Sequence, residues 1–228
     1  MKCLMALPLT VIFGLSVASA AATDTTTDIA TGERERFANN SNVEIEYSYV
    51  DDDVLQIRAR TELNGNSGGC IAAFMHLFED TERVKDWIEI VTDAELIAQP
   101  NPYTRIVHTE FDSHWPISDR DMVTRSIWQY DAESRALHIE ITNASEEKPP
   151  SKNVIRMTDV AASWHIQATE NGTVKVDYQG NSNPKGNIPR TSARASAITA
   201  VEQTFAALQT SIADSEYQKD YYSVPCLE

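Results

Sequence analysis

Histidine serves acid–base catalysis and metal binding near neutral pH more readily than other side chains, and this chain has five histidines. They stand at His76, His108, His114, His138 and His165. No two are four residues apart, which is the spacing that places two imidazoles on one helix face around zinc. The phosphate-binding patterns G-x-x-x-x-G-K-[ST] and G-x-G-x-x-G are also absent. The sequence therefore predicts no metal site and no cofactor.

The triplet Asp119-Arg120-Asp121 places an arginine between two acids, just ahead of a strand-like run that ends at Tyr130. Two carboxylates beside an arginine could form a catalytic pair. At the start of a strand, however, such an arginine is more often an ion-pair centre that fixes a loop, and we predict this structural role for all three residues. A second acidic group, Asp51-Asp52-Asp53, lacks the spacing of a calcium-binding EF-hand loop and predicts a hairpin turn.

The first twenty residues predict an export signal. Lys2 supplies the positive start, an apolar stretch follows from Leu4 to Val17, and Ala18-Ser19-Ala20 has the small residues of a cleavage site. The apolar run is shorter than the ~20 residues of a membrane-spanning helix, although an uncleaved anchor is the alternative. We expect an exported protein, periplasmic or secreted, in which residues 21–42 form a flexible leader and residues 43–228 one domain.

Cysteine and charge usage set limits on the partners. Cleavage of the signal leaves Cys70 and Cys226, which can form one disulfide in an oxidising compartment, with two free thiols as the alternative. The chain has 34 acidic and 19 basic residues and a net charge of −15, which repels nucleic acid and anionic membrane surfaces. We expect no nucleic-acid partner, no stable membrane insertion and a monomer.

Alternating apolar and polar residues predict strands. The alternation is regular at 43–49 and continues at 54–63 beyond the acidic turn. Six further strand-like runs follow at about 91–98, 103–112, 120–130, 135–142, 154–168 and 173–182. Turn residues lie between several of them, as at Asp131–Ser134 and Glu170–Gly172, which is typical of antiparallel hairpins.

Helical spacing of apolar residues occurs in two places. Residues 71–78 have apolar side chains at i, i+3, i+4 and i+7, and Thr81 can cap a short second helix after them. Near the end of the chain, the apolar spacing 3, 4, 3, 4 predicts a long helix with Thr191 or Ser192 as its cap; the residues are Ile198, Val201, Phe205, Leu208 and Ile212. A hairpin, two helices, several strands and a final helix form an α+β architecture.

Three segments in this order resemble the steroidogenic-acute-regulatory-protein-related lipid transfer (START) family over residues 43–214. They are Trp115-Pro116-Ile117-Ser118-Asp119-Arg120-Asp121, the strand opening Val154-Ile155-Arg156, and Gly186-Asn187-Ile188-Pro189 before the last helix. The resemblance implies a helix-grip fold, in which a curved antiparallel sheet wraps around the C-terminal helix and encloses an apolar tunnel. It also implies non-catalytic binding or transfer of a lipid or other hydrophobic small molecule.

Two other functions stay open at this point. Related helix-grip folds include enzymes of the cyclase or hydrolase type, so this chain could act on a hydrophobic substrate. It could also be an interaction module with a collapsed cavity.

The resemblance also assigns the tunnel wall, to which apolar side chains would contribute affinity and a few polar groups orientation. The predicted wall residues, each with core packing as the alternative, are Phe74, Phe78, Val107, Met122, Ser126, Trp128, Trp164, Ile188, Val201, Phe205 and Leu208. Sterol-carrying members place an acid and an arginine at the positions of Val107 and Ser126. Arg125 is one residue out of phase and should point to the other face, so a more apolar tunnel is implied.

Overall fold

One sheet forms most of the described protein. The computed structural model describes residues 35–38, 42–51, 54–64, 70–112 and 118–226. Several sequence predictions concern residues outside these ranges, namely the signal segment 1–20, Asp52 and Asp53 of the acidic turn, His114, and Trp115-Pro116-Ile117.

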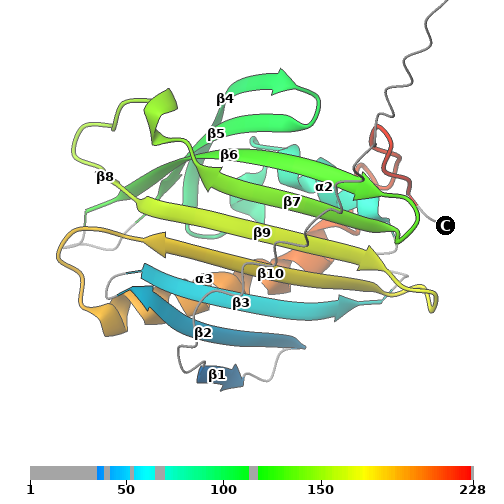
Figure 1. Ribbon diagram of the computed structural model, residues 1–228, viewed down its shortest axis with the longest axis horizontal. Helices are drawn as coiled ribbons and strands as arrows, with labels where there is room; N and C mark the ends of the chain where they lie inside the picture. The colour runs from blue at the N-terminus through cyan, green and yellow to red at the C-terminus, as the bar shows by residue number, and fades with distance from the viewer. Residues whose placement is uncertain (1–34, 39–41, 52–53, 65–69, 113–117, 227–228) are drawn as a thin grey trace, which may run out of the picture. The chain divides into compact units, whose positions relative to one another are not determined.

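Ten strands join in the order β1-β2-β3-β10-β9-β7-β6-β5-β4, with β8 beside β6 (Figure 1). They are β1 (Glu35–Ala38), β2 (Val43–Asp51), β3 (Val54–Leu63), β4 (Val91–Asn101), β5 (Thr104–Phe111), β6 (Arg120–Asp131), β7 (Ala136–Asn143), β8 (Ile155–Arg156), β9 (Thr158–Ala168) and β10 (Val174–Asn183). Neighbours along the path are antiparallel, and β8 joins β6 in parallel.

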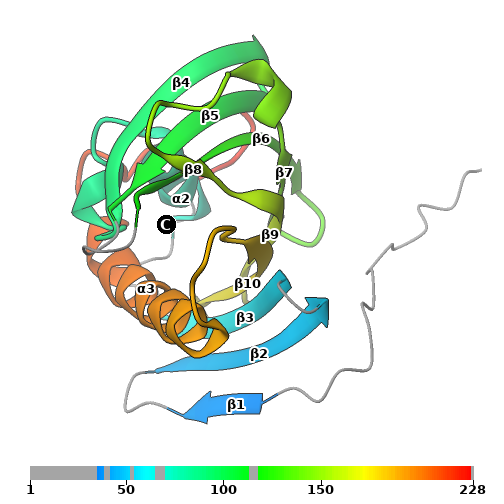
Figure 2. The same cartoon turned by 90° about the vertical axis from the view of Figure 1, so that its left-hand side faces the viewer.

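The sheet curves, and its concave side faces the long helix α3 (Arg190–Ser211), as Figure 2 shows. The shorter helix α2 (Ile71–Glu79) lies on the same side, and the 3-10 turns η1 (Val84–Asp86) and η2 (Ser145–Glu147) complete the described elements. This arrangement confirms the predicted α+β helix-grip fold. None of the described helices is long and apolar enough to cross a membrane.

Strand alternation explains the main core, because residues directly opposite each other in the register share a face. One row of paired residues runs across the concave face through Ile45, Ala59, Tyr178, Trp164, Ile139 and Trp128. From α3, the buried side chains of Ile198, Phe205 and Leu208 belong to the same core. Removing this apolar surface from water stabilises the fold by about 25 cal/mol per Å².

The structure corrects three boundaries. Strand β1 lies within residues 21–42, for which the sequence predicts a flexible leader, and it pairs with the edge of β2. The single strand predicted at 154–168 is divided into β8 and β9, because the Ile155 and Met157 amides donate to carbonyls at the start of β6. Helix α3 begins at Arg190 after Pro189, before the predicted caps Thr191 and Ser192; proline suits a helix start because its missing N–H has no helical acceptor there.

After α3, the C-terminal tail (residues 212–226) turns back against α2. The Tyr217 hydroxyl donates to Asp80 Oδ2 at 2.8 Å, and the Tyr221 hydroxyl donates to Glu79 Oε2. The tail ends in a disulfide between Cys226 and Cys70, whose Cα atoms are 4.3 Å apart. Of the two alternatives for the cysteines, the structure therefore has the bridge.

We expect the disulfide to contribute strongly to stability, because it links residues 156 positions apart. On the chain-entropy model a loop of this size contributes about 5 kcal/mol, as an upper value. The protein should melt at a lower temperature in reductant, and Cys226→Ser should cause the same loss and make reductant ineffective. If both thiols of the oxidised parent react with an alkylating reagent before reduction, this prediction is wrong.

Candidate functional site

The concave face differs in burial between its two halves. Near α2, an aromatic cluster closes the space between α3 and the sheet: Phe74 lies 5.3 Å from Trp164, and Trp164 lies 5.7 Å from Phe205, between ring centroids. These three residues, with Trp128 and Leu208, are at most 6% exposed. For these five predicted wall residues, the structure therefore shows core packing.

The other predicted wall residues keep accessible surface. Val107 pairs with Thr124, Met122 with Thr109, and Ser126 with Arg105, so Val107, Met122 and Ser126 share the face of Trp128. All three are only partly buried, and the same is true of Phe78 on α2, Val201 on α3 and Ile188 in the loop before it. Their contact with a ligand stays a prediction.

A row of small side chains separates the two halves. Gly180 on β10 pairs with Ala162 on β9, Ala162 pairs with Ile141, and Ile141 pairs with Ser126. This row directly follows the aromatic row that contains Tyr178 and Trp164. Three of its four members, Gly180, Ala162 and Ser126, have small side chains or none.

Tyr178 extends from the aromatic row over these small residues. Its ring lies 4.6 Å from the Trp164 ring and 6.4 Å from the Phe205 ring, between centroids. A Cβ atom added at Gly180 would be 2.1 Å from the Tyr178 Oη, so the ring covers the glycine. Burial raises the pKa of Tyr178 to about 12, and its hydroxyl makes no hydrogen bond to any residue of the described ranges. Sequence reasoning missed this residue, although a tyrosine two positions before a glycine on one strand face was visible.

A charged pair lies on the concave side at the C-terminal end of α2. Arg105 Nη2 is 2.9 Å from Glu79 Oε2, and Nη1 donates to the Glu79 carbonyl at 2.8 Å. Burial raises the pKa of Glu79, and the Tyr221 hydroxyl and Arg105 oppose this shift. This pair was not predicted, because Glu79 and Arg105 come from elements that only the fold brings together.

The structure divides the predicted ion-pair centre at 119–121 between two faces of the sheet. Arg120 and Asp121 are strand neighbours, so their side chains point to opposite faces. Arg120 donates hydrogen bonds to the carbonyls of Ser118, Pro184 and Lys185, at 3.3 Å and 3.1 Å for the last two. Burial lowers the pKa of Arg120, and the negative charge of Asp119 opposes this. Arg120 therefore joins the start of β6 to the loop before α3.

Asp121 instead forms a buried network on the convex face. It is fully buried, and it accepts from Arg156 Nε and Nη2, each at 2.8 Å, and from His108 Nε2 at 2.9 Å. Burial alone would raise the pKa of Asp121, but the hydrogen bonds from Arg156 and His108 hold it below its ordinary value. Arg125 shares this convex face and pairs with Glu147 at 2.7 Å, as the alternation predicts.

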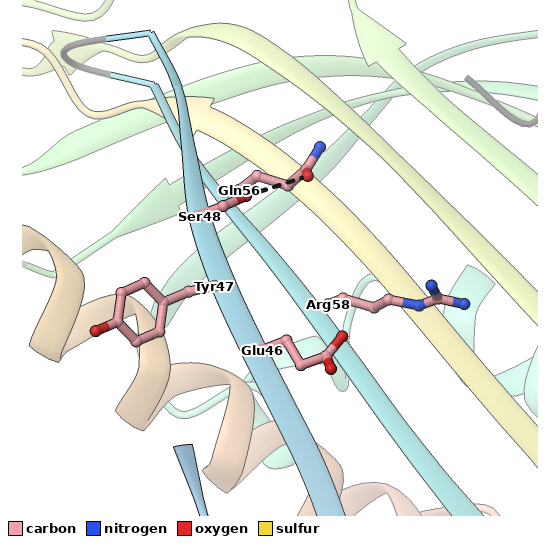
Figure 3. A pocket seen from close by; sticks show the side chains of 5 residues that line it. All are labelled: Glu46, Tyr47, Ser48, Gln56 and Arg58. Atoms are coloured by element: carbon pink, nitrogen blue, oxygen red, sulfur yellow. Dashed lines mark hydrogen bonds between the residues drawn. The ribbon is translucent and has the colours of Figure 1, made fainter. Parts of the chain in front are cut away.

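The described residues also line two hollows outside the concave face. One has a volume of about 10 Å³ and lies against Ser48 and Gln56, enough for about one water molecule. Figure 3 shows Ser48, Gln56 and Arg58 on one side of β2 and β3, and Tyr47 on the other side toward a helix. The second hollow, of about 280 Å³, lies between residues 81–85 and the start of β4, and most of its side chains are polar. Neither resembles an apolar ligand pocket.

Residues 65–69 spell G-x-S-x-G around Ser67, the pattern of the hydrolase nucleophile elbow. The segment lies outside the described residues. It follows β3, which pairs antiparallel with both β2 and β10, whereas the elbow of α/β-hydrolases stands at the top of an α/β sheet. The match therefore lacks the structural setting in which that elbow works.

The START domain profile matches residues 37–213, which include strands β2 to β10 and helices α2 and α3. The chain belongs to the START domain family. Domains of this family generally bind lipids or other hydrophobic ligands.

Three relatives illustrate the extent of the match. An uncharacterized protein of Pseudomonas aeruginosa is 26% identical over 143 residues, which are 61% of this chain and 68% of that protein. Human STARD10 is 17% identical with a TM-score of 0.68, over 80% of this chain and 74% of that chain. A STAR-related lipid transfer protein fragment from Xanthomonas axonopodis is 18% identical with a TM-score of 0.66, over 78% and 98%. At these identities, the two solved structures show the shared fold.

We expect Asp121→Asn to lower the free energy of unfolding by about 3–5 kcal/mol at pH 7, because it leaves Arg156 without its buried partner. The folded-state pKa of Asp121 lies below its ordinary value of 3.8, so the carboxylate stabilises the protein above that pH and stops doing so as pH falls through the folded value. In denaturant titrations, the gap between parent and variant should therefore shrink below about pH 4. The exposed pair of Arg125 and Glu147 offers a control. Because this pair is exposed, Glu147→Gln should lower the free energy of unfolding by at most about 1 kcal/mol. An equal effect of both variants at pH 7 would contradict the account.

Gly180→Ala should lower the free energy of unfolding by about 1–3 kcal/mol, because the new methyl group displaces the Tyr178 ring. The cost should disappear when Tyr178 is also changed to alanine, which a double-mutant cycle measures. A cost that persists in the Tyr178→Ala background would show that the glycine is needed for another reason.

Proposed function

We propose that this protein is an exported, non-catalytic carrier that binds one lipid or other hydrophobic molecule between α3 and the concave face of the sheet. One observation carries the proposal. Beyond the aromatic cluster, apolar side chains of the concave face and α3 retain accessible surface, among them Val107, Met122 and Val201. Such surface favours an apolar occupant by about 25 cal/mol per Å² covered.

The charges of the fold support binding over catalysis. His108 and the Asp121–Arg156 pair lie on the convex face, and His138 and His165 pair on that face across β7 and β9. His76 Nε2 donates to the Asp220 carbonyl of the tail at 3.2 Å. Acid–base chemistry on a ligand would need a free group on the concave face. The acid that the structure places there, Glu79, is already bound by Arg105 and by the Tyr221 hydroxyl.

The disulfide supports export, because disulfides persist in oxidising compartments. Residues 1–20 have the pattern of an export signal, and this agrees with the bridge. The net charge of −15 favours brief collisions with acceptor membranes over stable docking, since anionic surfaces repel the protein. We propose that transfer occurs in this way by a monomer.

Filling the space should abolish binding. We expect Met122→Trp to lower the affinity for a fluorescent apolar probe by at least tenfold, because a larger side chain on the concave face occupies the ligand's place. Ile127→Trp is the matched control, since Ile127 lies on the same strand with its side chain 48% exposed on the convex face. Probe fluorescence gives the affinities, and circular dichroism melting shows whether both variants fold.

Two results would overturn the proposal. One is a folded parent protein that binds no lipid or apolar probe from a broad panel, after any co-purified ligand has been removed and identified by native mass spectrometry. The other is a folded Met122→Trp variant that binds as the parent does.

A further inference from the structure

The hydroxyl group of Tyr178 has a position that neither packing nor an internal hydrogen bond explains. Its ring is held between Trp164 and Phe205, with centroid distances of 4.6 Å and 6.4 Å. The Oη atom projects beyond this cluster over Gly180, whose Cβ position also lies 3.3 Å from the Cβ of Ala162. The hydroxyl therefore points to the part of the concave face where the side chains are smallest.

Three other tyrosines of the same domain have their hydroxyl groups bound. Tyr49 donates to the Arg190 carbonyl at 3.3 Å, Tyr217 to Asp80 at 2.8 Å, and Tyr221 to Glu79. Tyr178 makes no such bond within the described ranges. The Tyr178 side chain is only partly buried, so a hydrogen-bonding group from outside the chain can reach its hydroxyl. A molecule bound on the concave face can supply that group.

The charges around this space indicate what kind of partner fits. Burial raises the pKa of Tyr178 to about 12, so the phenol stays neutral and offers a hydrogen bond without charge. Two arginines of the described concave face are already engaged: Arg105 by Glu79 and Arg120 by backbone carbonyls. A ligand carboxylate entering this space would lose its water without gaining a free cation, which is costly.

We propose that Tyr178 is the polar contact of the bound molecule, and that the site selects hydrophobic ligands with an uncharged hydrogen-bonding group, such as a hydroxyl or an ester carbonyl, over ligands with a carboxylate. This inference rests on the proposed carrier function. Apolar burial then supplies affinity, and one hydrogen bond to the Tyr178 hydroxyl selects the head group.

Ligands with one chain and different head groups test the inference. Dodecanol, methyl laurate and laurate would displace the apolar probe N-phenyl-1-naphthylamine from the disulfide-bonded protein at pH 8. The parent should bind dodecanol and methyl laurate more tightly than laurate. Tyr178→Phe should lower the affinity for dodecanol and methyl laurate by about fivefold, the usual effect of one neutral hydrogen bond. Its affinities for the probe and for laurate should stay within about twofold of those of the parent.

A control and a spectroscopic readout separate contact from structure. Tyr103→Phe is the control, because Tyr103 is 51% exposed. Removing its hydroxyl should change none of these affinities. The carbonyl stretching band of bound, 13C-labelled methyl laurate should lie at lower frequency in the parent than in Tyr178→Phe, because a hydrogen bond weakens the C=O bond. A merely structural role of Tyr178 would not move this band.

The outcomes are distinguishable. If Tyr178→Phe binds the probe and all three ligands as the parent does, or if laurate binds the parent most tightly, the assignment of Tyr178 is wrong and the carrier function stands. If the folded parent binds neither the probe nor any of the three ligands, the carrier function itself is wrong, and the Tyr178 assignment with it.

Discussion

The contact between α3 and the concave face of the sheet is the constraint on which the rest of this structure depends. A curved sheet with apolar residues on its inner side must be covered, and Ile198, Phe205 and Leu208 of α3 cover it. Both ends of the helix are anchored. Arg120 binds carbonyls of the loop before α3, and the tail after α3 is bridged from Cys226 to Cys70. These contacts fix the position of α3 against the sheet.

In the proposed carrier function, a rigid core and a ligand-binding surface lie side by side on this face. In the aromatic row the large rings fill the distance to α3, whereas Gly180, Ala162 and Ser126 do not. The ionic groups are arranged accordingly. Asp121, Arg156 and His108 are buried on the convex side, and the Arg105–Glu79 pair lies at the end of α2. The concave face between them has the partly buried side chains of Met122, Ser126 and Tyr178, and this surface suits the neutral, hydrophobic ligand that we propose.

Much of the fold could be predicted because its signals are local. Alternation predicts β3 with its observed bounds, Val54–Leu63, and a period of 3.6 predicts the buried stripe of α3. A disulfide between Cys70 and Cys226 was possible because two cysteines remain after signal cleavage. The sequence could not show whether their Cα atoms lie close enough to be bridged. Features without a local pattern were missed: β1 exists through pairing with the edge of β2, and the predicted strand 154–168 is divided by two amide bonds to the start of β6. Two carbonyl partners of Arg120, those of Pro184 and Lys185, also come from a distant segment, which the adjacent acids do not reveal.

The candidate site was less predictable for the same reason. Spacing identified which side chains share the concave face, but not which of them pack in the core and which stay accessible. The decisive test is the location of a bound ligand. In a complex with dodecanol, nuclear Overhauser effects between the ligand chain and methyl groups measure this directly. The account predicts contacts to Val107, Met122 and Val201 and none to Ile127. A saturated, folded complex with ligand contacts to Ile127 and none to the concave face would contradict it.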